Sequence, residues 1–284
     1  MRPIRSILFV PGTRTDRFPR AMAAGADAVV FDLEDGVDVS RKAEARRAVA
    51  EWLATAPASR TARFVRVNAS GSTWQAEDLA WLAVLSGHID GVVVPKAESP
   101  DDIERVAQTS PQSDVIPLLE TARGIIGAAA IAAAPARIPA LLFGAEDFTA
   151  ELGIPRTLDG EELLLARSQV VLAAAAIGAD AIDAVFVDLA APDQLRRDAV
   201  RARALGFRGK MAIHPDQVAT INDVFSPSAD EVARARRLIE AADAARRQGD
   251  GAFRFEDRMV DAPVIARARR VLALAEALAK SGSP

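Results

Sequence analysis

Short apolar runs alternate with longer alanine-, leucine- and arginine-rich stretches along most of the chain, and this alternation restricts the folds available to it. Each run is nearly continuously apolar, as expected of strands that are buried on both faces of a parallel sheet. Eight consecutive strand-then-helix units close most economically into a barrel, whereas a doubly wound open sheet normally stops sooner. We therefore predict an α/β fold, a TIM (β/α)8 barrel. Its strands are expected at residues 6–10, 28–33, 63–67, 91–95, 115–119, 140–143, 184–189 and 210–213.

Capping signals place helices between and after these strands. Ser99 suits a helix N-cap and Pro100 the first helical position, and residues 161–177 form another helical stretch. After the eighth strand, Ser228 and Glu231 have the spacing of a capping box that opens a further helix. A polar turn and a final helix follow, which is more than a barrel needs. We predict a barrel domain over residues 1–225 and a C-terminal helical extension over residues 226–284.

Composition excludes several classes of partner. With 50% hydrophobic and 26% charged residues, the 284-residue chain has the composition of a globular protein. Its formal net charge of −4 gives no overall attraction to nucleic acid or anionic lipid. No apolar run reaches the length of a membrane span, and the N-terminus lacks a signal-peptide pattern. We expect a cytoplasmic protein whose partners include neither nucleic acid nor membranes.

The absence of cysteine narrows the choice of metal. Without cysteine there is no disulfide, no thiolate nucleophile and no zinc–thiolate site. Any metal must be bound by oxygen atoms or by the two histidines, His88 and His214, and this favours a hard cation. His88 lies in a polar turn and is expected to be solvated. His214 could be a general base, a metal ligand or a cap at the end of its strand.

Charged residues gather at the predicted carboxyl ends of the strands, where the active site of a TIM barrel lies. Burying so many ionisable groups without a function would be costly, because each needs a partner or a shifted pKa. A shared pocket explains them together. They include Arg14, Asp32, Glu34, Asp35, Arg66, Lys96, Glu120, Arg123, Glu146, Asp147, Asp188 and His214.

Two of these carboxylates suggest a metal site. Glu120 and Asp147 follow neighbouring strands and can converge on one Mg²⁺ or Mn²⁺, leaving the other octahedral positions to water and substrate. Arg66 supplies a planar fork for a substrate carboxylate, which fits an enzyme that polarises a 2-oxo acid. Alternatively, the two carboxylates only favour helix starts or salt bridges, and Arg66 pairs inside the barrel with Asp32 or Glu34.

Seven short motifs lie in order at the strand ends: FVPG at 9–12, DLEDGV at 32–37, RVN at 66–68, VPK at 94–96, ETARG at 120–124, GAED at 144–147 and IHP at 213–215. Together they resemble the citrate lyase beta-subunit-like group of the HpcH/HpaI aldolase superfamily, which includes malyl-CoA and citramalyl-CoA lyases. The resemblance covers almost the whole chain. It implies a homo-oligomer, either a trimer or a hexamer. It also implies a carbon–carbon lyase that cleaves a 3-hydroxyacyl-CoA thioester to a 2-oxo acid and acetyl-CoA, or condenses them.

The resemblance also implies roles for individual residues. Mg²⁺ is expected on Glu120 and Asp147, and a substrate carboxylate is expected on Arg66. Gly144 and Ala145, in the GAED motif, are expected to bind the substrate.

Other strand-end residues have two interpretations each. Arg14 and Arg123 could bind the anionic parts of CoA or form salt bridges at the barrel rim. For Glu34 and Asp35 we favour a place behind the direct ligands, accepting hydrogen bonds from metal-bound water, over direct coordination or pairing with arginines. Lys96 could form a Schiff base, as in another class of aldolases, but the resemblance favours a lysine paired with a carboxylate.

The tail predicts a contribution from a neighbouring subunit. The barrel is complete before residue 226, and Phe253, Phe255 and Met259 then need an apolar surface, which a partner subunit offers. In the stand-alone CoA ester lyases that the chain resembles, the aspartate of the matching segment reaches across the interface, and Asp261 occupies that place. We predict that Asp261 is the acid and base at the CoA methyl carbon. The alternative is an N-cap of the final helix.

Two other functions stay open. One is the lyase subunit of a citrate lyase complex that acts on a thioester of an acyl carrier protein, although the tail resembles the stand-alone lyases more closely. The other is a catalytically silent oligomeric binding module, against which the full set of strand-end charges speaks. A thioesterase activity could also follow cleavage.

Overall fold

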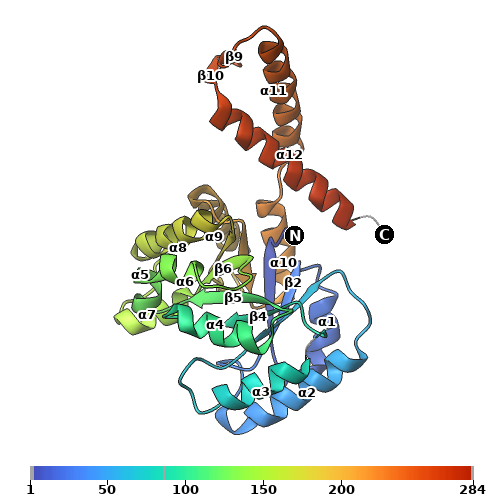
Figure 1. The fold of residues 1–284 in the computed structure, drawn as a ribbon, viewed down its shortest axis with the longest axis vertical. Helices are drawn as coiled ribbons and strands as arrows, with labels where there is room; N and C mark the ends of the chain where they lie inside the picture. Colours follow the sequence, from blue (N-terminus) through green and yellow to red (C-terminus); the bar gives the residue numbers. More distant parts are fainter. Residues whose placement is uncertain (1–2, 86, 283–284) are drawn as a thin grey trace. The chain divides into compact units, whose positions relative to one another are not determined.

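The computed structural model describes residues 3–85 and 87–282 and contains a closed barrel of eight parallel strands in chain order (Figure 1). β8 pairs with β1, which closes the barrel and confirms the predicted TIM fold. The strands are β1 Ser6–Pro11, β2 Ala28–Asp32, β3 Ala62–Arg66, β4 Gly91–Val94, β5 Asp114–Leu119, β6 Ala140–Phe143, β7 Asp180–Asp183 and β8 Gly209–Ala212.

The predicted seventh strand, residues 184–189, is wrong, because β7 ends at Asp183. Asp188, which was expected in this strand, lies outside it and is exposed. The apolar run after β7 looks more like a buried strand than β7 itself, which begins and ends with aspartate. Asp183 is fully buried because Arg167 and Lys210 form ion pairs with it. The other predicted strands overlap the observed ones.

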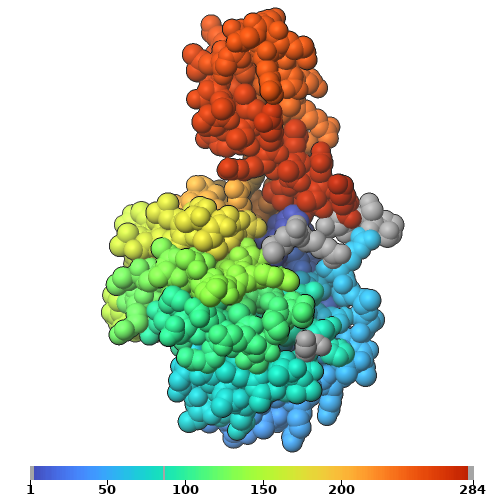
Figure 2. Space-filling view, in the orientation of Figure 1, coloured from blue at the N-terminus to red at the C-terminus, as the bar shows by residue number. Residues whose placement is uncertain are grey.

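Helices between the strands form the outer layer of the barrel, and successive units from cyan to yellow lie side by side in the space-filling view (Figure 2). The predicted N-cap is confirmed, since Ser99 and Asp102 form a capping box. Within the described ranges, no helix combines the length and apolarity that crossing a membrane requires. The α-helices are α1 Phe18–Met22, α2 Lys42–Thr55, α3 Gln75–Leu85, α4 Pro100–Thr109, α5 Ala122–Ile126, α6 Ala128–Ala132, α7 Ala145–Leu152, α8 Leu164–Ile177, α9 Pro192–Leu205 and α10 Pro215–Phe225. The short 3-10 helices are η1 Thr15–Arg17, η2 Val39–Arg41 and η3 Glu161–Leu163, and η3 begins the helix predicted at 161–177.

Two apolar layers explain why the strands are apolar throughout. Ile7, Val30 and Phe64 pack in the barrel interior. Their chain neighbours Leu8 and Val29 belong to the layer between strands and helices. Successive residues of a strand point to opposite faces, and both faces are buried here. The interior is therefore a packed core, and the polar groups that could bind a ligand lie at the carboxyl ends of the strands.

The described residues form two compact units, one of Ile4–Phe225 and a second one of the chain from Ser226 onward together with Pro3. The second unit, which we call the extension, contains α11 Ala229–Arg247, a hairpin of β9 Phe253–Phe255 and β10 Arg258–Val260, and α12 Ala262–Gly282. The predicted capping box at Ser228 is confirmed. The hairpin was not predicted, because its turn residues Glu256 and Asp257 adopt positive φ angles where glycine or asparagine is the usual signal.

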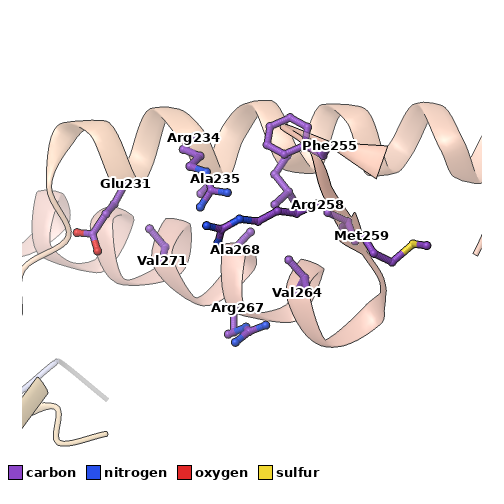
Figure 3. A pocket seen from close by; sticks show the side chains of 12 residues that line it. Glu231, Arg234, Ala235, Phe255, Arg258, Met259, Val264, Arg267, Ala268 and Val271 are labelled. Atoms are coloured by element: carbon purple, nitrogen blue, oxygen red, sulfur yellow. The ribbon is translucent and has the colours of Figure 1, made fainter. Parts of the chain in front are cut away.

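The extension has its own apolar cluster and a cavity of about 470 Å³ between α11, the hairpin and α12 (Figure 3). Leu238, Val260 and other apolar residues are buried there. Phe253 and Phe255, which look exposed in the sequence, pack against this cluster. Met259, the third tail residue that was predicted to need an apolar surface, is 73% exposed.

Candidate active site

Arg66 is fixed at the mouth of the barrel by two carboxylates. Asp32 and Arg66 are paired at the ends of β2 and β3. Arg66 donates from Nε to Asp32 Oδ1 at 2.6 Å and from Nη2 to Asp32 Oδ2 at 2.7 Å, and its Nη1 lies 2.7 Å from Glu34 Oε2. Burial would lower the pKa of Arg66, but the negative charges of Asp32 and Glu34 outweigh it and raise that pKa. The pairing that the sequence left open is therefore present.

The turn after β2 is built around Asp32. Its carboxylate accepts hydrogen bonds from the backbone N–H groups of Glu34 and Gly36, both at 2.9 Å. A Cβ at Gly36 would lie 2.4 Å from Asp32 Oδ2, so this position requires glycine. The turn directs the buried carboxylate of Glu34 toward Arg66 and Lys96, and burial raises the pKa of Glu34.

Lys96 connects four carboxylates. Its backbone N–H donates to Glu120 Oε1 at 2.8 Å. Its ammonium group donates to Glu34 and, at 3.1 Å, to Asp35 Oδ2, and it lies 3.6 Å from Asp147 Oδ1. The carboxylates outweigh the effect of burial and raise the pKa of Lys96. An ammonium held in this way fits the predicted ion pair and not the free amine that a Schiff base needs.

Glu120 is a buried carboxylate beside a second negative charge. Glu120 follows β5 directly and is 2% exposed. A Cβ at Gly144 would lie 2.5 Å from Glu120 Oε2, so the glycine makes room for this carboxylate. Burial and the charge of Asp147 raise the pKa of Glu120 to about 8. Loss of its proton therefore leaves a negative charge at the mouth of the barrel that Arg66 and Lys96 compensate only in part.

Asp147 lies in the first turn of α7, which begins directly after β6 and Gly144. Its side chain is 37% exposed, in contrast to that of Glu120. Ala145 is buried at the start of the same helix, and Glu146 is paired with Arg156. The GAED motif thus brings one predicted metal residue, Asp147, and the predicted substrate residues Gly144 and Ala145 to one helix start.

A cavity of about 310 Å³ opens at these strand ends. Of the predicted residues, Arg66, Glu120, Gly144, Ala145 and Asp147 line it, whereas Glu34 and Asp35 do not. The lining residues are Phe9, Pro11, Arg17, Asp32, Gly36, Arg66, Leu118, Glu120, Gly144, Ala145, Glu146, Asp147, Val185, Met211 and Ile213.

The arginines predicted to bind CoA lie elsewhere on the barrel. Arg14 is engaged by Asp16 in two hydrogen bonds of 2.9 and 2.8 Å. Arg123 has a side chain that is 78% exposed, 3.5 Å from Glu98. Neither residue lines the cavity, so their binding roles stay predictions. Arg17, which was not predicted from the sequence, does line it. The available signal was a basic residue shortly after the first strand, where Arg17 ends η1.

The two histidines lie apart from the carboxylate pair. His88 is exposed in a turn, as expected. His214 accepts a hydrogen bond from the backbone N–H of Asp216 at 3.3 Å and lines a neighbouring cavity of about 250 Å³ with Arg17 and Arg20.

The chain is similar to known proteins over almost its whole length. A model of the HpcH/HpaI aldolase/citrate lyase family matches residues 5–215. The chain belongs to this family. A citrate lyase subunit beta-like protein of Deinococcus radiodurans is 44% identical to it, covering 95% of this chain and 96% of its relative. A (3S)-malyl-CoA thioesterase of Cereibacter sphaeroides is 36% identical, covering 99% and 98%. The solved structure of the CitE protein of Mycobacterium tuberculosis with magnesium, acetoacetate and coenzyme A matches with a TM-score of 0.82 and 40% identity, covering 96% and 98%.

Membership of the HpcH/HpaI family makes the chain an enzyme of the carbon–carbon lyase type. Its donor set fits a hard divalent cation. Glu120 and Asp147 offer only oxygen atoms, and a cation would relieve the repulsion that raises the pKa of Glu120. In the part of the chain that the structure describes, no three His, Asp or Glu side chains converge as metal ligands. Two carboxylates with water and substrate in the other positions is a common arrangement for Mg²⁺.

Asp261 belongs to the extension and precedes α12. It is exposed, and its Oδ1 lies 3.5 Å from the backbone nitrogen of Val264, a long hydrogen bond for an N-cap. The alternative role of Asp261 as an N-cap is therefore present, but its hydrogen bond is weak. A carboxylate held so loosely is available for other contacts.

Proposed function

We propose that this HpcH/HpaI family member is a Mg²⁺-dependent lyase for 3-hydroxyacyl-CoA thioesters such as malyl-CoA or citramalyl-CoA. The observation that carries the proposal is the pair of carboxylates at the barrel mouth, where buried Glu120 and Asp147 repel each other beside the fixed cation of Arg66. Such a pair suits a divalent cation, and the adjacent cavity has room for a small oxo acid.

Each group in the cavity has a separate task. When bound, the cation supplies Lewis-acid polarisation of the substrate's hydroxyl or keto oxygen. Arg66 binds the carboxylate of the oxo-acid half through the N–H groups that Asp32 and Glu34 leave free. Because both partners hold the guanidinium in place, little conformational freedom is lost when substrate binds. Gly144 and Ala145 provide the cavity wall next to Glu120.

In the cleavage direction, the hydroxyl group loses its proton to solvent, and the bond between the carbon that carries this hydroxyl and the carbon next to the thioester carbonyl breaks. The oxygen becomes the keto group of the 2-oxo acid, and the electron pair passes to the thioester as an enolate. We propose that Asp261 of a neighbouring subunit protonates the enolate carbon to give acetyl-CoA, and removes the same proton in condensation.

A thioesterase activity is the second candidate. A malyl-CoA thioesterase is similar to this chain over almost its full length, and that observation favours hydrolysis of the thioester bond. The two functions give different products from malyl-CoA. A lyase yields acetyl-CoA and glyoxylate, whereas a thioesterase yields malate and free CoA.

The decisive experiment is a substrate panel of malyl-, methylmalyl-, citramalyl- and citryl-CoA, with the corresponding acyl carrier protein thioesters. We expect Mg²⁺-dependent release of a 2-oxo acid and acetyl-CoA from a CoA thioester, and loss of this activity on chelation. Preference for a citryl thioester on a carrier protein would support a citrate lyase subunit instead. Full activity after exhaustive chelation would contradict the metal-dependent mechanism, and binding without turnover of any thioester would indicate a binding module.

Asp261→Asn tests the proposed acid separately. Asn caps a helix about as well as Asp, so a capping role predicts almost no effect. A catalytic role predicts a loss of turnover of roughly three orders of magnitude or more at unchanged stability. If one site draws on two chains, mixing this variant with an Arg66 variant should restore part of the activity after subunit exchange. A fully active Asp261→Asn enzyme would end this assignment.

A further inference from the structure

Lys96 has an unusual backbone conformation. Its φ angle is +47°, and in the described part of the barrel it is the one non-glycine residue with positive φ. Lysine rarely occupies this left-handed region, and a residue stays there when the surrounding contacts determine its conformation. In this conformation the backbone N–H of Lys96 donates to Glu120 Oε1 while the side chain reaches Glu34, Asp35 and Asp147.

The contacts of the Lys96 ammonium are graded. It is closest to Glu34, at 3.1 Å from Asp35, and at 3.6 Å from Asp147. The longest contact thus goes to the carboxylate that lines the cavity, and the shorter two go to carboxylates that do not. Lys96 itself does not line the cavity, so it acts on ligands there through the carboxylates and not by direct contact.

We propose that Lys96 is a positioning residue that serves as the internal counter-ion of the divalent-cation site. In the metal-free protein its ammonium offsets the negative charge of Asp147 next to Glu120. When the divalent cation binds, the contact between Lys96 and Asp147 is lost and Asp147 binds the cation, while Lys96 keeps its ion pairs with Glu34 and Asp35. This inference rests on the proposed metal site.

The Lys96 ammonium and the divalent cation compete for Asp147. The direction in which metal affinity changes when the ammonium is removed therefore tests the proposal. Removing the ammonium leaves the carboxylates with less positive charge, so a divalent cation should bind more tightly while the metal-free fold becomes less stable. A change that merely damaged the site would weaken metal binding. Tighter binding therefore separates the counter-ion role from a structural one.

The experiment measures Mn²⁺ affinity by electron paramagnetic resonance on the metal-free wild type and on Lys96→Met, Lys96→Asn and Lys96→Arg. Met has nearly the length of Lys, and Asn tolerates the positive φ angle, so one neutral variant remains informative if the other folds poorly. We expect both neutral variants to bind Mn²⁺ roughly tenfold more tightly than wild type and to melt at a lower temperature without metal. Lys96→Arg keeps the charge and should bind like wild type.

Lys42→Met is the matched control. Lys42 is a buried lysine at the start of α2, and its ammonium donates to the carbonyl oxygens of Leu33 and Glu34, at 2.8 and 2.7 Å. Its loss should lower stability and raise the Mn²⁺ affinity far less than the loss of Lys96, because the Lys42 charge acts on Asp32, Glu34 and Asp35, whereas the Lys96 ammonium lies 3.6 Å from Asp147. Equal or weaker Mn²⁺ binding by both neutral Lys96 variants would overturn the counter-ion role while the metal site itself stands. Absence of Mn²⁺ binding by the wild type would overturn both.

Discussion

The barrel contains two clusters of buried charged residues that are built from the same residue types but differ in charge balance. The balanced network, between the strands and α8 and α9, joins Arg167 and Lys210 to Asp183 and Asp198, two cations for two carboxylates. The mouth cluster sets two cations against five carboxylates and borders a cavity. It consists of Arg66 and Lys96 with Asp32, Glu34, Asp35, Glu120 and Asp147.

The pKa values of buried carboxylates shift in opposite directions in the two clusters. In the balanced network, burial would raise the pKa of Asp198, but Lys210 and Arg167 outweigh it and hold that pKa well below its usual range. In the mouth cluster, burial and Asp147 outweigh Arg66 and raise the pKa of Glu120. Buried charge alone therefore does not identify a site. Unbalanced charge beside a cavity does, because it leaves a place for a ligand of opposite sign.

The largest effect is expected for Asp147→Ala. Turnover of the thioester should fall by about four orders of magnitude, equivalent to about 5 kcal/mol, because one of the two carboxylates proposed to bind the metal is lost. The melting temperature should change little, since the side chain is 37% exposed and has one ion contact at 3.6 Å. Asp35→Ala is the matched control, because Asp35 also contacts Lys96 but does not line the cavity. An Asp35 variant as inactive as the Asp147 variant would remove the distinction between the two carboxylates.

Arg167→Met probes the balanced network. It leaves Asp183 and Asp198 with Lys210 as their shared cation, so we expect a loss of about 3–5 kcal/mol in the free energy of unfolding. Denaturant unfolding measures this, and the folded variant should keep its turnover and metal affinity. Arg137→Met, which breaks an exposed pair with Asp114, should cost less than about 1 kcal/mol. Loss of metal binding in the Arg167 variant would show that the two clusters are not independent.

Arg66→Lys keeps the charge in the mouth cluster but loses the planar fork. The specificity constant kcat/KM should fall about a hundredfold, close to 3 kcal/mol, with Mn²⁺ affinity unchanged. Steady-state kinetics and metal titration on the same preparation check both parts. Near wild-type kinetics would make Arg66 a structural partner of Asp32 and nothing more.

The smallest effect is a pH dependence of the metal-free protein. Because the pKa of Glu120 in the folded protein is raised to about 8, its contribution to stability is full below the unfolded value near 4.5. That contribution is lost as the pH rises toward 8. We expect the melting temperature to fall by about 3 °C per pH unit in this range, by calorimetry in the presence of a chelator. Glu120→Gln should flatten the slope, and an unchanged slope in this variant would assign the effect to another group.

The sequence predicted most of the barrel and the membership of the mouth cluster. Continuous apolar runs mark strands with two buried faces, and polar residues after them mark the strand ends, where Arg66, Glu120 and Asp147 line the cavity. The position of β7 was predicted wrongly, because an ion-paired strand end such as Asp183 has a polar sequence although it is buried. Local sequence carries no record of the long-range partners that make such burial tolerable.

The direction of side chains could not be predicted from the sequence either. Arg14 and Arg17 follow the same strand, and the sequence offers no means to tell which one faces the cavity. A local carboxylate, Asp16, decides the matter by engaging Arg14. The left-handed conformation of Lys96 was equally hidden, because it depends on contacts with Glu120 and Glu34 that lie far away in the chain.

The most direct test of the central claim is a count of bound Mn²⁺ on variants of both clusters. Electron paramagnetic resonance on metal-free protein should detect a single Mn²⁺ site per wild-type chain. The double variant Glu120→Gln, Asp147→Asn should lose this site while its melting temperature stays close to that of the wild type. Arg167→Met should keep the site although its fold is less stable. Retention of wild-type Mn²⁺ affinity by the double variant would contradict the claim that unbalanced charge at the barrel mouth forms the metal site.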